Sequence, residues 1–381
     1  MQNNAVVCGF ARSPFQPANR GAFTRLRADD LLARVTRGLI DRTAIDPADL
    51  EDIIIGCAFP EAEQGFNIAR YQVFLNDLPV RVPGATVNRW CASSMTAVHQ
   101  AVGQIAAGAG DLFICGGIEH MSRIPMGGYN AMPHPELIKR WPETYTAMGV
   151  TAENLARTYQ IDRQAQERYA VTSHHKAAKA REDGRLSDEI VPIDLADGTV
   201  VEHDATIRAD TNAEKMATLK PSFEAEGTVH AGTSSPLTDG ATAVLIASEA
   251  YARANGLHIY ARIRSVATEG CKPEIMGIGP VGAAKKAMGR AALSMDDMDI
   301  IELHEAFASQ AMAVVQDLGV DMDKTNLDGG TLAIGHPLGA SGSRYIGKLA
   351  TLLEREDKEL GIAFVCVGGG MGAATILERA A

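Results

Sequence analysis

The chain has 381 residues, of which 46% are hydrophobic and 22% charged, and its formal net charge is −11. At ~150 residues per domain this length predicts two or three domains, and the composition excludes a disordered or fibrous chain. The negative charge argues against non-specific nucleic-acid binding, because it provides no basic field. No apolar run approaches the ~18 residues of a membrane span. The N-terminus, MQNNAVVCGF, lacks the basic flank and apolar stretch of a secretory signal.

The six cysteines carry no C-x-x-C spacing, which argues against a zinc site or a dithiol redox motif. In a long chain without a secretory signal they are typical of reduced thiols, so we expect a cytoplasmic, bacterial-type protein. A cysteine is most often a small buried hydrophobe, and a reactive role therefore needs further evidence.

In chain order, apolar β-rich runs predict eight strands, and segments with helical spacing separate them. One helix is expected where Met95, Val98, Val102 and Ile105 recur, and another where Phe307, Ala311, Val314 and Leu318 recur before Gly319. This alternation predicts an α/β protein with mostly parallel sheets covered by helices. The expected strands are Ala5–Cys8, Ile53–Cys57, Leu112–Cys115, Thr242–Ala247, Ile259–Val266, Asp299–Leu303, Ile362–Val367 and Ala373–Leu377.

The second half of the chain resembles the first, which predicts an internal duplication. In the second half Gly369 leads almost at once to Gly372, whereas a long excursion separates Gly117 from Gly240 in the first. We expect this excursion, with a helix over Gln164–Arg181, to be a lid or substrate-binding insertion; the alternative is a decorative surface insertion. The parallel blocks, in the same order, are Arg42–Ile55 with Arg290–Leu303, Ile114–Gly117 with Cys366–Gly369, and Gly240–Ile246 with Gly372–Leu377.

Cys91 is the strongest candidate nucleophile. It lies in VNRWCASSM, directly before an amphipathic helix that is expected to start near Ala92. The positive end of a helix dipole and free backbone N–H groups both stabilise a thiolate, so this position predicts a lowered thiol pKa.

Two histidines could assist this cysteine. His336 lies in the glycine-dense segment GGTLAIGHPLGASG, before a helix, where core packing explains it poorly. His304 lies in LHEAF, where a strand enters a helix, and the carboxyl ends of strands are where α/β sheets place ligands. A structural role is the alternative for either histidine alone.

Cys366 ends a predicted strand and opens CVGGGMG, where glycines let backbone N–H groups point at a ligand, as an oxyanion hole requires. The alternative is a buried cysteine before a tight turn. Gly277–Gly282 matches G-x-G-x-x-G, but no strand directly precedes it and Pro280 removes an N–H that could contact phosphate. We therefore do not expect NAD binding.

Taken together, these blocks resemble the thiolase family over essentially the whole chain. VNRWC around Cys91 is similar to the family's nucleophile block, Gly329–Gly342 to its histidine block, and Cys366–Gly372 to its C-x-G-G-G-M-G block. AGTSS at Ala231 and MGIGP at Met276 match further segments. The blocks around Cys91 and GGIEHM look closest to the degradative 3-ketoacyl-CoA thiolases.

The resemblance implies two duplicated βαβαβαββ halves in a five-layer α-β-α-β-α arrangement, in an α/β protein with an inserted loop domain. It implies residues 1–119 plus 231–258 as the N-terminal half, 120–230 as the loop domain that binds coenzyme A, and 259–381 as the C-terminal half. It also implies a homodimer or tetramer, and no metal or redox cofactor, since coenzyme A is a substrate.

The implied mechanism gives each reactive residue a role. His336 activates Cys91, whose thiolate attacks the ketone of a 3-ketoacyl-CoA. Cys366 protonates the acetyl-CoA enolate and later deprotonates a second CoA. One oxyanion hole combines His336 with a water positioned by His304, and the other combines the N–H groups of Cys91 and Gly368. Matched positions imply CoA or acyl contacts at Ser235, Ala231, Arg208, Phe223, Met148, Met276 and Phe307, with Arg208 toward the nucleotide phosphates.

One departure from the family pattern concerns His304. Many thiolases carry Asn there, and His is similar to the thiolase subunits of trifunctional fatty-acid-oxidation complexes, which implies a possible hydratase and dehydrogenase partner subunit. It also gives a Cys–His–His set like that of ketosynthases, but Cys366 favours a thiolase. The alternatives are a biosynthetic acetoacetyl-CoA thiolase or ketosynthase-like condensing enzyme, and a catalytically silent CoA-binding subunit.

Overall fold

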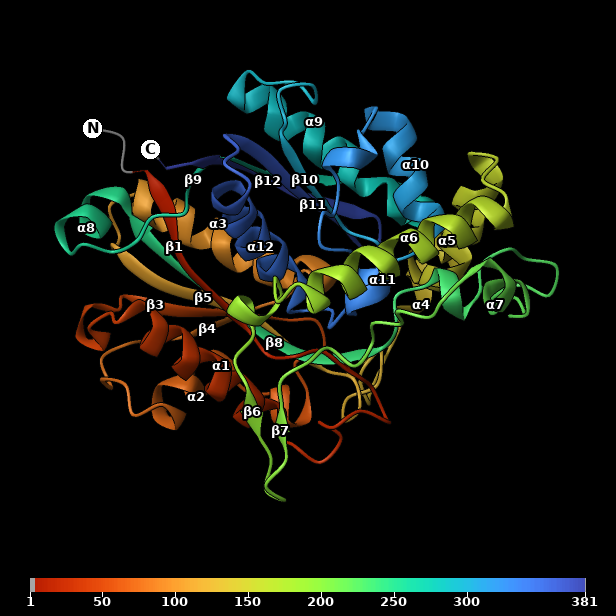
Figure 1. The fold of residues 1–381 in the computed structure, drawn as a ribbon. Helices are drawn as coiled ribbons and strands as arrows, with labels where there is room; N and C mark the ends of the chain where they lie inside the picture. Colours follow the sequence, from red (N-terminus) through yellow and green to blue (C-terminus); the bar gives the residue numbers. More distant parts are fainter. Residues whose placement is uncertain (1–3, 381) are drawn as a thin grey trace.

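The computed structural model describes residues 4–380, and Figure 1 shows their arrangement. Ten strands form one mixed sheet in the order β10-β11-β12-β9-β1-β8-β5-β3-β4, with β2 beside β8. All eight predicted strands are present, most of them longer than predicted. The bounds are β1 Ala5–Arg12, β2 Gln16–Pro17, β3 Asp52–Cys57, β4 Ala85–Val87, β5 Leu112–His120, β8 Thr238–Ser248, β9 Ala261–Gly270, β10 Ile300–Leu303, β11 Leu360–Val367 and β12 Met371–Arg379.

The prediction of mostly parallel sheets was wrong. Six of the strand pairings in this sheet are antiparallel, and three are parallel. In the second half β11 leads directly into β12, and the two strands pair antiparallel. Their counterparts β5 and β8 in the first half also pair antiparallel, although the insertion lies between them in the sequence. The alternation of helix and strand correctly predicted only the parallel part of each half.

The sheet divides at a narrow contact between β1 and β9, where only Val6 and Val7 pair with the second half. The first half has the order β4-β3-β5-β8-β1, and the second has β10-β11-β12-β9. An isolated parallel bridge from Ile301 to Thr325 takes the place that β4 has beside β3. The predicted duplication is therefore confirmed by topology.

One detail of the predicted repeat was wrong. Ile53 lies opposite Ile114 in the first half, and Ile301 lies opposite Ile362 in the second. Ile114 therefore corresponds to Ile362 and not to Cys366. Matching the two glycine pairs by their sequence had shifted one strand against its counterpart.

The elements form five layers held by three apolar clusters. One cluster surrounds the central helices and contacts both half-sheets, and the other two lie between each half-sheet and its outer helices. The central layer is α3 (Ser93–Ala106) with α12 (Ser341–Arg355), both largely buried between the two half-sheets (Figure 1). One outer layer is α1 (Ala28–Thr43) with α2 (Ile68–Leu75), and the other is α9 (Gly279–Ala291) with α10 (Ala308–Leu318). The predicted helices at α3 and α10 are confirmed, and Gly319 ends α10 with a φ of 63°.

The segment between β5 and β8 carries its own elements, including the predicted helix, which is α6. Buried ion pairs connect this segment to both halves. Arg12 in β1 contacts Glu189 and Asp204 of the segment, and Lys348 in α12 contacts Glu189. The domain boundaries proposed from the sequence stay predictions. The elements are α4 (Pro135–Arg140), α5 (Met148–Thr158), α6 (Arg163–Glu182), β6 (Ile193–Asp194), β7 (Val200–Val201) and α7 (Ala213–Ala217); α8 (Glu249–Ala254) and α11 (Thr331–Ile334) lie elsewhere.

The G-x-G-x-x-G segment has a packing explanation. It runs from a short 3₁₀ helix into α9, and a Cβ on Gly279 would lie 2.1 Å from the backbone oxygen of Met371 in β12. Glycine there lets the helix approach the sheet. Among the described residues, no helix is both long and apolar enough to cross a bilayer.

Candidate active site

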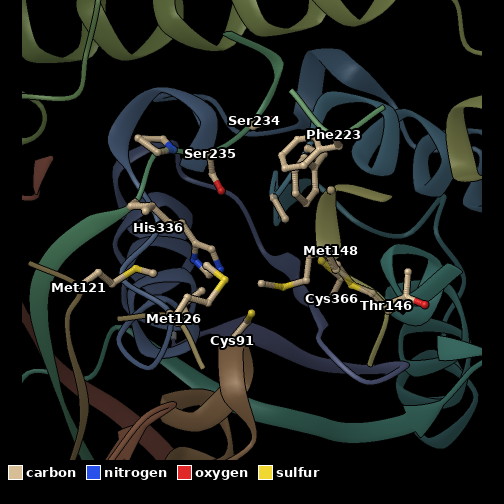
Figure 2. Close-up of a pocket in the computed structure, with 18 residues that line it drawn as sticks. Cys91, Met121, Met126, Thr146, Met148, Phe223, Ser234, Ser235, His336 and Cys366 are labelled. Carbon is tan, nitrogen blue, oxygen red and sulfur yellow. The ribbon is translucent and has the colours of Figure 1, made fainter. Parts of the chain in front are cut away.

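A cavity of about 520 Å³ brings Cys91, His336 and Cys366 together. Figure 2 shows Cys91 at the end of its helix, pointing into the cavity, with His336 on one side. Cys91 comes from the first half, and the other two residues come from the second. The remaining walls are mostly apolar, with methionine and phenylalanine side chains from the insertion and from the second half.

Cys91 lies in a 3₁₀ turn, Trp90–Ala92, that leads directly into α3. Trp90 adopts a φ of 41°, and this left-handed turn places the Cys91 side chain ahead of the helix. Burial raises the pKa of Cys91 to about 12, although the backbone N–H groups of Gly368 and Cys91 act to lower it. The predicted lowering of this pKa was wrong, because desolvation outweighs the local N–H groups. Cys91 is therefore a thiol at rest and needs a base.

His336 lies in the loop between α11 and α12, after Gly335, whose φ of 106° suits glycine. Its backbone N–H donates to Thr238 Oγ1 at 3.0 Å, and its Nδ1 lies 2.6 Å from Ser341 Oγ. Burial lowers the pKa of His336 to about 3, so the ring is neutral. Its Nε2 has no hydrogen-bond partner among the described residues. A neutral, buried and oriented imidazole can accept a proton from a thiol.

Cys366 and His304 form a second pair behind the first. Cys366 Sγ lies 3.3 Å from His304 Nδ1, and the His304 and His336 ring centroids are 4.3 Å apart. Burial, and then the neighbouring Cys91, raises the pKa of the Cys366 thiol well above its usual range. His304 is fully buried and does not line the cavity. Any contact between His304 and a ligand would therefore pass through another group.

Gly368 follows β11 in a turn that only glycine fits well. Gly369 and Gly370 adopt φ values of 73° and 86°. A Cβ on Gly368 would lie 3.3 Å from the Trp90 ring, which packs against this turn. The N–H groups of Gly368 and Cys91 both face the Cys91 sulfur. This is the geometry that an oxyanion hole over a cysteine thioester requires.

The residues predicted to contact CoA divide between two neighbouring pockets. Ser235, Phe223, Met148, Met276 and Phe307 line the cavity that holds the cysteines. Ala231 and Arg208 line a second pocket of about 230 Å³, which also contains Arg20 and His174. Both pockets include Ser234 and Pro236, so they adjoin. The cavity with the sulfurs is apolar, and its neighbour carries cationic side chains.

Among the described residues, no cluster of His, Cys, Asp and Glu side chains could hold a metal ion.

Comparison with known families accounts for this arrangement. The model of the thiolase N-terminal domain matches residues 5–250, and that of the thiolase C-terminal domain matches residues 257–379. The chain belongs to the thiolase family. Several relatives of this thiolase match it at full length. A 3-ketoacyl-CoA thiolase of Pseudoalteromonas translucida (strain TAC 125) is 46% identical over 386 residues, covering 99% of each chain.

A second relative, the 3-ketoacyl-CoA thiolase of Vibrio cholerae serotype O1, is 45% identical over 386 residues, covering 99% of this thiolase and 100% of the relative. Among solved structures, human mitochondrial 3-ketoacyl-CoA thiolase superposes with a TM-score of 0.92 at 32% identity, covering 100% of both chains. The fold predicted from the sequence blocks is thus confirmed.

Sequence analysis of this thiolase missed part of the cavity wall. Leu338 follows His336 in its motif, and Ser234 and Leu237 flank Ser235, so these could have been found as neighbours of predicted residues. Met121 ends the quoted GGIEHM block but had no role assigned. For Met126, which follows it, only the general placement of ligands at strand ends gave a signal. Ser341, which contacts His336, lies inside the quoted histidine block but had no role assigned.

Proposed function

We propose that this thiolase cleaves 3-ketoacyl-CoA with free CoA, giving acetyl-CoA and a chain-shortened acyl-CoA, in fatty-acid β-oxidation. The observation that carries the proposal is that Cys91, His336 and Cys366 line one apolar cavity. Two thiols beside one neutral imidazole suit a reaction that needs both a nucleophile and a separate acid. The full-length relatives bear the name of this activity.

In the first half-reaction, His336 Nε2 takes the proton of Cys91, and the thiolate attacks the ketone carbon. The bond between the α and β carbons breaks, and its electron pair forms the enolate of acetyl-CoA. Cys366 gives its proton to that enolate carbon. Acetyl-CoA leaves, and the acyl group stays on Cys91 as a thioester.

In the second half-reaction, the Cys366 thiolate takes the proton of an incoming CoA thiol. The CoA sulfur attacks the thioester, and the Cys91 thiolate that leaves takes its proton back from His336. All groups return to their starting state. The N–H groups of Cys91 and Gly368 stabilise the oxyanion on the thioester carbon. The protonated His336 and a water held by His304 stabilise the enolate oxygen.

The two adjoining pockets suggest how CoA is bound. Met148, Met276, Phe223 and Phe307 offer adaptable apolar contacts to the acyl chain and the pantetheine arm. Arg208, at the second pocket, meets the nucleotide phosphates, because a chain of net charge −11 needs local cations to hold an anion.

We further propose a homodimer or tetramer located in the cytoplasm. Strand β4 ends the sheet order and leaves one edge open to pairing. Phe66, Phe74 and Val80, which flank and form α2, are 90%, 53% and 73% exposed. The six cysteines are free, as in a reducing compartment. A monomeric mass at micromolar concentration by light scattering would contradict the oligomer. A hydratase and dehydrogenase partner subunit rests on the His304 resemblance alone.

The testing experiment measures thiolysis of 3-ketoacyl-CoAs of increasing chain length with free CoA. We expect acetyl-CoA with every length that is accepted, and kcat/KM should rise by about fourfold per added methylene while the chain fits, since one buried CH₂ contributes about 0.8 kcal/mol. No acetyl-CoA from any substrate would refute the activity. Turnover of a malonyl thioester in its place would indicate a ketosynthase-like enzyme.

A further inference from the structure

Helix α6 of the insertion packs against α11, the short helix that leads to His336 (Figure 1). A Cβ added to Gly329 would lie 2.6 Å from the Cβ of Ala177 and 2.8 Å from the carbonyl oxygen of Ser173, both in α6. Gly329 also adopts a φ of 82°, so space and backbone conformation both require glycine there. The glycine pair Gly329 and Gly330 is therefore the surface on which the insertion rests.

One hydroxyl of α6, that of Ser173, contacts two separate segments of the second half. It accepts the backbone N–H of Gly330 at 3.1 Å, and it lies 2.7 Å from Oε2 of Glu305. Ser173 is 4% exposed and Glu305 2%, so both contacts are shielded from solvent. Gly330 precedes α11 and His336, whereas Glu305 directly follows His304 beyond the end of β10. The insertion thus contacts both segments that carry the two histidines.

The Glu305 carboxylate is held firmly between α6 and the second half. Tyr169 of α6 contacts its Oε1 at 3.3 Å, Asn326 Nδ2 donates to the same oxygen at 2.6 Å, and Leu332 N–H donates to Oε2 at 3.3 Å. The Asn326 amide has one orientation, because its Oδ1 accepts the backbone N–H of Leu303 and its Nδ2 donates to the Leu303 carbonyl. The carboxylate is therefore a rigid contact between the insertion and the end of β10.

The same helix also forms a wall of the second pocket. His174, the residue after Ser173, lines this pocket, and its Nδ1 accepts the Arg208 backbone N–H at 3.2 Å. Leu332, whose N–H donates to Glu305, lines it as well. The pocket assigned above to the CoA nucleotide and the segments that carry the histidines therefore share α6 as a common neighbour.

We propose that α6, through Ser173, couples the second pocket to the reactive cavity, so that binding of the CoA nucleotide positions the segment that carries His336. Phosphates that hold Arg208 also hold its backbone against His174, and this fixes α6. Ser173 lines neither of these two pockets, so it is a positioning residue. The coupling rests on the proposed function for the placement of the nucleotide. Through it, binding energy from the non-reacting end of the substrate raises the rate at saturation as well as the affinity.

The first test needs no turnover. The probe is adenosine 3′,5′-bisphosphate, the nucleotide end of CoA without its thiol arm, and the readout is alkylation of Cys91 by iodoacetamide, followed by mass spectrometry of its peptide. Saturating nucleotide should speed alkylation by about five- to tenfold, the factor that one net hydrogen bond supplies, because the group that ionises this thiol is then held in place. In Ser173→Ala the nucleotide should leave the rate unchanged.

Two further variants keep this test decisive. Ser309→Ala is the matched control, because it removes a buried hydroxyl that joins α10 to the insertion at the carbonyl of Ala152, and it should respond as the wild type does. Tyr169→Phe removes the other contact of α6 with Glu305 at less risk to folding and should reduce the nucleotide effect in part. No effect of the nucleotide on the wild type, or the same effect in Ser173→Ala, would overturn the coupling.

The second test separates the coupling from the proposed function. It measures release of the acetyl thioester in a single turnover without free CoA, from a 3-ketoacyl-CoA and from the same acyl group on pantetheine. Ser173→Ala should lower the saturating rate with the CoA substrate by about five- to tenfold and change the rate with the pantetheine substrate by less than about twofold. An equal fall with both substrates would show a purely structural role and overturn the proposal. No acetyl thioester from either substrate in the wild type, with the nucleotide effect on Cys91 intact, would refute the function alone.

Discussion

The two halves of this thiolase share a strand order but supply different chemistry. The first half contributes Cys91, in the turn before its central helix α3. The second contributes His336, before its central helix α12, and Cys366, in β11. Duplication thus placed two helix starts against each other in the central layer, and the halves diverged at these starts. The nucleophile and its base come from equivalent ends of two related folds.

The same serine hydrogen bond occurs at the start of both central helices. α3 begins at Ser93 and α12 at Ser341. Each hydroxyl donates to a carbonyl in the preceding turn, Ser93 to Trp90 at 2.7 Å and Ser341 to Pro337 at 3.0 Å. Only Ser341 also contacts an imidazole. A residue that stabilises a turn in one half therefore gained a second contact in the other.

The largest effect should come from removing the nucleophile of the first half. Cys91→Ala should lower kcat by on the order of 10⁴-fold or more, because the thiolate that takes up the acyl group is then missing. The measurement is steady-state thiolysis. Cys115→Ala, which removes a buried thiol from β5 of the same half, is the matched control and should keep most of its activity. Comparable loss in both variants would mean that the effect is one of folding.

A smaller effect should follow from weakening the contact between the halves at Glu119. This buried carboxylate accepts N–H groups of Ala58, Phe59 and the Gln64 side chain in the first half, and that of Gly339 in the second. Glu119→Gln turns an NH₂ group toward two of these donors. We expect a loss of about 2–4 kcal/mol in the free energy of unfolding, measured with urea. The exposed control Glu51→Gln should change it by less than about 0.5 kcal/mol. An equal loss in the two variants would show that the hydrogen bonds of Glu119 do not contribute to the free energy of unfolding.

The smallest effect concerns the insertion, which only the first half carries. His174 in α6 accepts the Arg208 backbone N–H, and burial lowers the pKa of His174 to about 4. The folded state therefore binds fewer protons than the unfolded chain between pH ~6.5 and ~4, so stability falls as pH falls through this window. His174→Asn keeps an acceptor and should flatten the slope by about 1.4 kcal/mol per pH unit. The exposed control His203→Asn should leave the slope unchanged, and an unchanged slope in His174→Asn would contradict the account.

The sequence predicted what depends on local pattern. Periodicity located α3, α6 and α10, and the apolar runs located the strands. Glycine-rich segments correctly placed His336 before a helix and Cys366 at the end of a strand, and the resulting family resemblance predicted the layers. The expected strand-to-helix junction at His336 was wrong, because His336 follows helix α11.

What the sequence could not predict depends on long-range packing. The antiparallel pairings follow from which strands meet, and the register of β5 against its counterpart follows from pairing partners. The raised pKa of Cys91 depends on burial by residues far along the chain, which outweighs the helix end visible in the sequence. The contact of Ser341 with His336 depends on the conformations of the two side chains, which a sequence motif does not specify.

The two halves divide the chemistry, with the nucleophile in one half and the acid in the other. The most direct measurement is intact mass after incubation with an acyl-CoA donor, for the wild type, Cys91→Ala and Cys366→Ala. We predict one acyl group on the wild type, a slower gain of one acyl group on Cys366→Ala without turnover, and none on Cys91→Ala. An acyl group on Cys91→Ala, or equal loss of acylation in both variants, would contradict the division of roles.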